Sequence, residues 1–378
     1  MSRDRRRVWA ALLIAVALIM AACGGDGGDE GEETSGGGGE AGGGESISDL
    51  KAAFIYVGPV GDAGWTYRHN EGRKCLEEEG VETAFVESVP ETAEVEGVER
   101  DFVAEGFDVI FATAFGYQPF TQKVAQENSD VYFFGITPTV APAPNIQNFY
   151  GKLWDGRYLT GLVAGSMTKS NEIGFVAAQP IPTVIAGINA FTLGVREVNP
   201  DATVRVVWTL SWFDPPKEKQ AAVSLVRGGA DVVAQHQDTP SAVQGAAQEG
   251  AWAVGSESDM TEFAPDKYLT GTIWDWCNFY KQAMQQVADG EFEAGEFYGG
   301  LDDGTVQIAP LNDAVPDDVQ QRVEEAEQAL MNGELDYWEG PIQDNEGNTV
   351  VGEGETVTIE DINKMDWLVE GVEGSIPE

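Results

Sequence analysis

The fold is decided by residues 173–210, which read IGFVAAQPIPTVIAGINAFTLGVREVNPDATVRVVWTL. A short apolar run over 173–178 comes first, and after a proline-containing turn the apolar residues of 182–198 recur with a helical period. A second apolar run over 204–210 completes the pattern. Strand, helix and strand joined by short turns are typical of a βαβ unit, whose strands pair in parallel.

The same alternation extends through the chain on both sides of this unit. Upstream, strands are expected at 52–57, 84–86, 108–114 and 131–136, with helices between them, the first over 65–80. Downstream, helices are expected at 215–227, 241–250 and 277–288, and strands at 232–235, 252–256 and 269–273. Two such series predict an α/β protein with two lobes, each a parallel sheet flanked by helices.

Composition excludes several classes of function. The chain has 378 residues, with 22 Lys and Arg against 64 Asp and Glu, so its net charge is −42. A surface this negative repels phosphate backbones and anionic lipid headgroups, so we expect no nucleic-acid partner. With 42% apolar residues the chain can still build a large core, and its 3 cysteines and 2 histidines are too few for a multi-cysteine zinc site. We expect no metal and no cofactor.

The N-terminus has the features of an export signal. Basic residues at 3–7 precede an apolar run over 8–20, which is shorter than the roughly 20 residues that span a bilayer. Ala21-Ala22-Cys23 resembles a bacterial lipobox, although Met20 stands where Leu is more usual. This predicts a lipoprotein signal peptide over 1–22 and lipidation of Cys23. The alternative is an ordinary secretory signal in which this cysteine is incidental.

Residues 23–46 are rich in glycine and acidic residues and can bury almost no apolar surface. We therefore expect a disordered tether that holds a folded body at the extracytoplasmic face of the cell membrane. The lipid anchor would be the only membrane contact.

The candidate site follows from the predicted sheets, because ligands of open α/β sheets bind beyond the carboxyl ends of the strands. Aromatic and acidic residues stand directly after the predicted strands of both lobes. The candidate ligand-binding residues are Asp62, Trp65, Phe115, Tyr117, Trp212, Asp238, Asp259 and Trp274. Aromatic rings can stack on a flat heterocycle while carboxylates accept hydrogen bonds from its N–H groups, so the set suits such a ligand.

Each of these residues also has a purely structural interpretation. Asp62 is placed to cap the helix that begins near Trp65, and Asp238 could cap a helix before Pro240. Trp65 and Trp212 could be core residues, since most tryptophans are largely buried. His69 and His236 could suggest catalysis, but the sequence has no nucleophile motif to accompany a histidine base.

Two cysteines remain once Cys23 is assigned to lipidation. Cys75 and Cys277 fall on predicted helices that would flank the same lobe if the chain crosses back near Trp274. An extracytoplasmic compartment permits a disulfide between them. Two unpaired, buried thiols are the alternative.

Several stretches of the body resemble one family. They are GDAGWTYRHNEG (61–72), YGKLWDGRYLTGLVAG (150–165), PIPTVIAGINAFTLGVREVNP (180–200), SWFDPPKEK (211–219), GADVVAQHQDTP (229–240) and MDWLVEGV (365–372). In this order they resemble the basic membrane protein family of substrate-binding lipoproteins of ABC transporters. The match runs from about residue 50 to the C-terminus.

The resemblance implies a type I periplasmic-binding-protein fold with the ligand in the hinge cleft. The N-terminal lobe would hold 47–151 and about 275–300, and the C-terminal lobe with its tail would hold about 152–274 and 301–378. It also implies a purine-type ligand and ABC permease and ATPase partners, and we expect a monomer. No enzyme activity is implied.

The family's site carries over only in part. Asp62, Trp65 and Thr66 match the positions where nucleoside-binding members have Asp, a stacking aromatic and Asn, and Trp212 matches a second stacking aromatic. Where those members hold ribose with a V-D-S-D segment and a Lys, this chain has SESD at 256–259 and Trp274. The departure favours a nucleobase such as adenine over a nucleoside.

Other functions stay open at this point. A receptor for a sugar or sugar-like solute would also use an acidic, aromatic cleft. A sensor that signals rather than imports would have the same sequence features. A surface hydrolase or deaminase would need a metal or nucleophile cluster, against which the scarcity of His and Cys argues.

Overall fold

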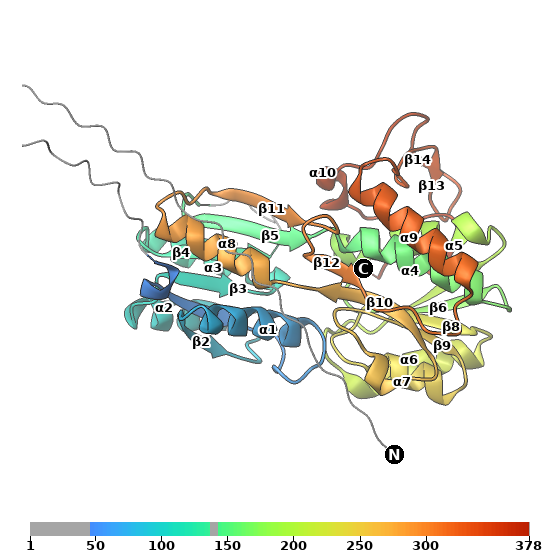
Figure 1. Cartoon of the computed structure of the whole chain (residues 1–378), viewed down its shortest axis with the longest axis horizontal. Coiled ribbons are helices and arrows are strands. Elements are labelled where there is room, and N and C mark those ends of the chain that lie inside the picture. Colours follow the sequence, from blue (N-terminus) through green and yellow to red (C-terminus); the bar gives the residue numbers. More distant parts are fainter. Residues whose placement is uncertain (1–45, 137–142, 378) are drawn as a thin grey trace, which may run out of the picture. The chain divides into compact units, whose positions relative to one another are not determined.

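The computed structural model describes residues 46–136 and 143–377 (Figure 1). The predicted signal peptide over 1–22, the predicted lipidation site Cys23 and the predicted tether, apart from Ser46, lie outside the described residues. The described chain contains two large sheets, each with helices packed against it. Each sheet with its helices is called a lobe below, which confirms the predicted α/β architecture with two parallel sheets.

Lobe 1 is built on a six-stranded parallel sheet in the order β11-β5-β4-β3-β1-β2. Its strands are β1 (Lys51–Ile55), β2 (Glu82–Val86), β3 (Val109–Ala112), β4 (Tyr132–Ile136), β5 (Ile146–Gly151) and β11 (Gly295–Gly299). Its helices are α1 (Trp65–Glu78), α2 (Glu94–Ala104), α3 (Gln118–Glu127) and α8 (Cys277–Ala288).

Both faces of the lobe 1 sheet are covered, which follows from the alternation of side chains along a strand. The ring of Phe54 in β1 meets the edge of Tyr280 in α8, with ring centroids 5.1 Å apart. Its neighbour Ile55 points to the opposite face and belongs to a separate cluster with Val95 of α2. Strands buried on both faces read as continuous apolar runs, as the sequence does here.

Lobe 2 is built on a seven-stranded sheet in the order β12-β10-β9-β8-β6-β7-β15, parallel except for the β10–β12 pair. Its strands are β6 (Glu172–Ala177), β7 (Thr203–Trp208), β8 (Val232–Gln235), β9 (Trp252–Gly255), β10 (Tyr268–Trp274), β12 (Val306–Ile308) and β15 (Val372–Glu373). Its helices are α4 (Leu153–Met167), α5 (Pro182–Val198), α6 (Pro215–Arg227), α7 (Ser241–Gln248) and α9 (Asp317–Met331).

The C-terminal tail adds small elements to lobe 2. They are the hairpin of β13 (Ile342–Gln343) and β14 (Thr349–Val351), and α10 (Ile359–Ile362); the short 3₁₀ helices elsewhere are η1 (Ile47–Asp49), η2 (Phe115–Tyr117) and η3 (Thr261–Phe263). Asn189 of α5 fastens the tail: its amide donates to the Trp367 carbonyl at 2.9 Å and accepts from the Val369 amide at 2.9 Å.

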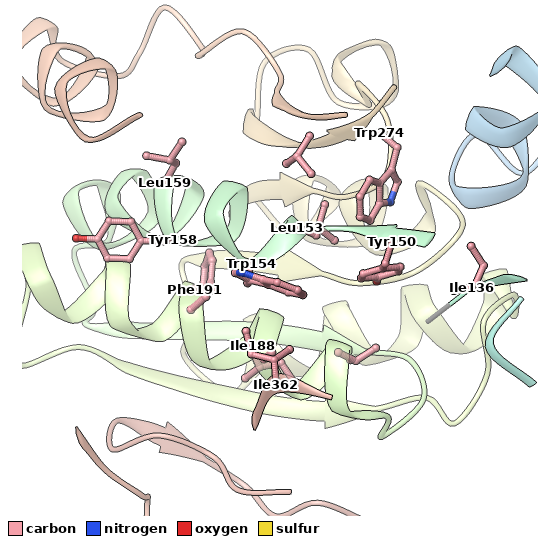
Figure 2. Close-up of a cluster of buried hydrophobic side chains, with 14 of the residues drawn as sticks. Ile136, Tyr150, Leu153, Trp154, Tyr158, Leu159, Ile188, Phe191, Trp274 and Ile362 are labelled. Atoms are coloured by element: carbon pink, nitrogen blue, oxygen red, sulfur yellow. The ribbon is translucent and has the colours of Figure 1, made fainter. Parts of the chain in front are cut away.

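The chain passes between the lobes after β5, after β10 and after β11, and these crossings are bonded to one another. The amide of Lys152 donates to the carbonyl of Gly299 at 2.8 Å, and that of Asp275 donates to Thr305 at 2.9 Å. Apolar packing continues across the same region: Figure 2 shows Tyr150 of β5 beside Trp274 of β10, with ring centroids 5.3 Å apart. The crossings therefore form one hinge region.

A disulfide joins Cys75 in α1 to Cys277 at the start of α8, with their Cα atoms 5.7 Å apart. Both helices pack on the same lobe, and this settles the alternative that the sequence left open between a disulfide and two free thiols. Within residues 46–136 and 143–377, no helix is both long and apolar enough to cross a bilayer.

Candidate functional site

A pocket with an empty volume of about 460 Å³ lies between the lobes, where the carboxyl ends of both sheets face each other. Lobe 1 contributes Val57, Trp65, Glu91, Ala114, Phe115, Ile136 and Tyr150 to its lining. Lobe 2 contributes Ile181, Thr183, Val184, Trp212, His236, Asp238 and Glu257. Most of these residues lie at the carboxyl end of a strand or in the segment between that strand and the next helix, as expected for an open α/β sheet.

Trp65 is the first residue of α1, and its indole ring is held from several sides. Its Nε1–H donates to the carbonyl of Thr113 after β3 at 2.7 Å. His69 and Trp274 both pack against it in T-shaped geometry, with ring centroids 4.3 Å and 5.8 Å from its own centroid. The ring is thus fixed before any ligand arrives, which limits the entropy that binding would cost.

Asp62 explains why α1 begins where it does. Its carboxylate accepts hydrogen bonds from the amides of Gly64, Thr66 and Tyr67, each at 2.9 Å. These are free amides of a first helical turn, so Asp62 makes capping contacts. Burial raises the pKa of Asp62, and the amide hydrogen bonds oppose that rise.

Trp212 reaches the pocket from the loop between β7 and α6 of lobe 2. Its Nε1–H donates to the Oε2 atom of Glu91 in lobe 1 at 3.0 Å. The other carboxylate oxygen of Glu91 accepts from the amide of Gly116 at 2.7 Å. The Gly116 amide of lobe 1 therefore orients Glu91, and Glu91 in turn binds the Trp212 indole of lobe 2.

Asp238 is a buried acid in the pocket wall. It is buried, with 3% of its surface exposed, and among the described residues none donates a hydrogen bond to its carboxylate. Burial, and then the negative charges of Asp62 and Glu257, raise its pKa well above the ordinary value. Ionising a buried acid without a donor is costly, so a ligand that donates hydrogen bonds would stabilise the carboxylate form of Asp238.

Glu257 follows β9 in a left-handed conformation, with φ of +71°. Its carboxylate accepts from the hydroxyl of Ser256 at 2.8 Å and from the indole N–H of Trp274. Burial raises its pKa, and the positive charge of Arg157 opposes the rise. Non-glycine residues in this conformation cluster at functional sites.

Arg157 of α4 is buried behind this wall and ties two strand ends together. Its Nη1 donates to the carbonyl of Gln235 at the end of β8 at 2.8 Å, and its Nη2 donates to the hydroxyl of Ser256 at 2.5 Å. The residues that follow these two strand ends line the pocket. Arg157 therefore fixes the wall from which His236 and Glu257 project.

His236 presents a polar atom that no described residue bonds. Its Nδ1 is buried and has no hydrogen-bond partner within 46–136 and 143–377, and its Nε2 lies 3.6 Å from Oε1 of Glu257. Burial lowers the pKa of His236 well below the ordinary value, so the ring is neutral. A neutral imidazole can donate from one nitrogen and accept at the other, which suits readout of a polar ring.

The predicted site residues are placed as follows. Trp65, Phe115, Trp212 and Asp238 line the pocket. The remaining four are not part of the lining: Asp62 caps α1, Tyr117 donates to the Val89 carbonyl at 2.6 Å, Asp259 is exposed and accepts from the Thr261 amide at 2.9 Å, and Trp274 is buried behind Glu257.

Five polar lining residues were not among the predicted set: Glu91, Tyr150, Thr183 at the start of α5, His236 and Glu257. Glu257 and His236 do follow strands directly, so their position was the available signal. Glu91 and Tyr150 had none: Glu91 lies in the irregular segment after the edge strand β2, and Tyr150 lies inside β5. Nothing local marks either as facing a cleft.

The side chains that line the pocket are suited to binding a small molecule. Flat aromatic surfaces and carboxylates converge on a small pocket, and among the described lining residues none is Lys or Arg. No group of His, Cys, Asp and Glu among the described residues is arranged to hold a metal ion. Such a pocket suits a compact, neutral or cationic ligand with hydrogen-bond donors and a flat face.

Comparison with known proteins identifies the family, while the names of two relatives point to different ligands. A sequence model of the family described as ABC transporter substrate-binding protein, PnrA-like, matches residues 50–338. A purine-binding protein of Brucella abortus is 39% identical over 332 residues, which cover 87% of this chain and 94% of that protein. The glucose-binding protein proposed for an ABC transporter of Haloferax volcanii is 36% identical over 330 residues, covering 87% and 81%.

Among solved structures, an ABC transporter solute-binding protein from Conexibacter woesei superimposes with a TM-score of 0.64 at 25% sequence identity. The similarity covers 76% of this chain and 97% of that one.

Proposed function

The chain belongs to the family of PnrA-like ABC transporter substrate-binding proteins, and we propose that it captures a purine-type ligand between its lobes and delivers it to a permease. It is a substrate-binding protein and not an enzyme. The ligand we propose is a nucleobase such as adenine, or a nucleoside. One observation supports this most: the buried Asp238, to whose side chain no described residue donates a hydrogen bond, lies in a pocket whose wall includes an indole from each lobe.

The chemistry of a purine matches this wall. Its ring is flat, so it can stack on an indole, and base stacking on an aromatic side chain is worth about 1–3 kcal/mol. Its N–H groups can donate to Asp238 and Glu257, while ring nitrogens can accept from a neutral His236. The purine-binding relative from Brucella abortus, at 39% identity, supports the same ligand class.

A sugar or sugar-like solute is the second candidate, favoured by the relative from Haloferax volcanii at 36% identity. Carboxylates accept from sugar hydroxyls as readily as from N–H groups. The two ligands place different demands on the wall, because a sugar offers hydroxyls around its whole rim while a base offers two flat faces.

Calorimetric titration of the full chain with adenine, adenosine, glucose and ribose separates the candidates. We expect binding of adenine or adenosine, and a loss of roughly 5- to 150-fold in affinity for Trp212→Ala, the equivalent of about 1–3 kcal/mol. Trp208→Ala is the matched control, since Trp208 is also half-buried and its indole N–H also bonds, to the Ser375 carbonyl at 3.0 Å, but it is absent from the pocket lining. Binding of glucose or ribose alone would replace the purine proposal with the sugar one.

We further propose that the protein is held at the extracytoplasmic face of the cell membrane through a lipid on Cys23. The basic, apolar and Ala-Ala-Cys order of residues 3–23 supports this. A tether between anchor and body would let the lobes reach a permease in the same membrane.

A further inference from the structure

The two lobes touch through their backbones at one position beside the pocket. Gly64 lies directly before α1 in lobe 1, and Asp238 follows β8 in lobe 2. A Cβ atom added to Gly64 would lie 2.6 Å from the carbonyl carbon of Asp238 and 2.7 Å from its Cα, with the carbonyl oxygen nearer still. Separations below 3.0 Å essentially never occur for real Cβ atoms. Backbone atoms cannot rotate away as a side chain can, so any side chain at residue 64 would force the lobes apart.

A second contact crosses the cleft next to the first. The hydroxyl of Ser258 in lobe 2 donates a hydrogen bond to the carbonyl of Ala63 in lobe 1. The backbone is in the left-handed region in both lobes here: Ala63, which accepts the bond, has φ of +64°, and Glu257, which precedes Ser258, has φ of +71°. Such conformations persist only where the surrounding structure holds them, and here they coincide with the place where the lobes meet.

From these contacts we infer that lobe 2 closes directly against the backbone of Gly64, and that glycine is required at this position for the closed state. The inference rests on the proposed capture of a ligand between the lobes. Gly64 is not among the residues that line the pocket. It is therefore a positioning residue, which acts on affinity by permitting Asp238 and the rest of the lobe 2 wall to approach Trp65.

The chain offers a matched control three residues away. Gly61 lies in the same loop, and a Cβ atom there would meet nothing within 4 Å. Gly61→Ala therefore changes the same type of residue in the same segment without obstructing closure. The backbone of Gly64, with φ of −133° and ψ of −124°, lies outside the regions that alanine prefers, so Gly64→Ala could also disturb the start of α1.

An obstruction placed on the opposite lobe separates these two effects. Ser258 is buried against Ala63, so Ser258→Val adds bulk at the same closure contact without touching α1. Ser258→Ala removes only the hydroxyl and keeps the space clear. If closure is what matters, Gly64→Ala and Ser258→Val have the same consequence from opposite sides.

The test measures adenine affinity by calorimetry and backbone hydrogen exchange by mass spectrometry on the full chain. We expect Gly64→Ala and Ser258→Val each to weaken adenine binding at least about tenfold, and Gly61→Ala to stay within about threefold. Ser258→Ala loses the hydrogen bond to Ala63 but adds no bulk, so it should lose less affinity than Ser258→Val. Because the two obstructions block one closure, their combined effect should be well below the product of the single effects. Amides of both facing segments, 61–67 and 256–260, should exchange faster in either obstructed variant.

The inference is overturned if Gly64→Ala binds adenine as the wild type does, if Gly61→Ala loses as much affinity, or if faster exchange in Gly64→Ala stays confined to 61–67. The exchange measurement is also made without ligand, since the lobes are already in contact in the structure. Failure of adenine to bind the wild type would therefore refute the proposed ligand, while the exchange pattern would still decide the role of Gly64.

Discussion

The indole N–H of Trp212 donates a hydrogen bond to the carboxylate of Glu91, 3.0 Å away on the opposite lobe. The two residues line the same pocket, so a side chain placed to contact a ligand also holds the lobes together. Closing the lobes and forming the pocket are thus one event. A ligand that fits the pocket stabilises the closed state by its differential affinity for it.

Trp212→Phe should isolate the hydrogen bond from the ring. Phenylalanine keeps a stacking surface but cannot donate to Glu91, so we expect a loss of about 1 kcal/mol, or roughly fivefold, in ligand affinity. Glu91→Gln should also weaken binding, because its single amide oxygen can accept from the indole or from the Gly116 amide but not from both. Titration of both variants with adenine checks this, and equal affinities for Trp212→Phe and wild type would show that the cross-lobe bond contributes nothing.

Asp238→Asn should have opposite effects on stability and on binding. The pKa of Asp238 is raised by burial and by neighbouring acids, so its ionisation opposes folding as the pH rises above its ordinary pKa near 3.9. We therefore expect the ligand-free variant to melt higher than wild type at pH 7, with the difference disappearing below about pH 4. Its adenine affinity should fall, because a carboxylate acceptor is gone. Thermal melts at both pH values, with and without adenine, test the pair of effects.

Glu99 should make lobe 1 less stable as the pH rises from about 4 to about 8. Its carboxyl group is buried between α2 and α3, accepts from the hydroxyl of Thr121 at 2.5 Å, and burial raises its pKa to about 8. The folded protein therefore keeps a proton that the unfolded chain loses above about pH 4.3, and stability falls as pH rises from there to about 8, by at most about 1.4 kcal/mol per pH unit. Urea unfolding at several pH values should show that the unfolding free energy falls less steeply with pH in Glu99→Gln than in the wild type. Parallel plots of unfolding free energy against pH for the two proteins would contradict this prediction.

The disulfide between Cys75 and Cys277 should stabilise lobe 1. It joins α1 to α8, which are far apart in the chain, so its removal frees a long loop in the unfolded state. We expect a loss of about 2–5 kcal/mol of unfolding free energy on reduction or in Cys75→Ser/Cys277→Ser. The double variant should be insensitive to reductant in denaturant melts. A wild-type midpoint unchanged by reductant would argue against the bond.

Cys23→Ser should release the protein from the membrane. The proposed anchor is a lipid on this one side chain, and among residues 46–136 and 143–377 no helix could replace it as a membrane span. Cell fractionation should move the variant from the membrane fraction to the soluble extracytoplasmic fraction, with ligand affinity unchanged. Retention in the membrane would point to uncleaved residues 8–20 or to another contact.

The elements of the fold were largely predictable because strand and helix periods are local properties. The helix expected over 182–198 is α5 (Pro182–Val198), and the proline at its first position belongs to the same local signal. The antiparallel β12 was not predicted, because a strand as short as Val306–Ile308 has too few residues to show the alternation of apolar and polar residues that marks a strand. The extents of the two lobes along the chain stay a prediction.

The lining of the candidate pocket was predictable only where it coincides with a strand end. Trp212 and Asp238, which line the pocket, stand shortly after β7 and β8, and their role in binding stays a prediction. Tyr117 and Asp259 follow the same rule, but Tyr117 bonds within its own lobe to Val89 and Asp259 points to solvent. Proximity to a strand end places the backbone near the cleft and leaves the direction of the side chain undecided.

By itself, the sequence determined the two α/β lobes and the acidic character, and it predicted the sheet edge where the pocket lies, since each depends on composition or on neighbours in the chain. Only the tertiary structure decided which residues meet across the cleft. Gly61 and Gly64 are alike as letters in GDAG, yet only Gly64 lies against the backbone of Asp238. The reason is physical: such a contact arises from the packing of two lobes, and no local pattern records it.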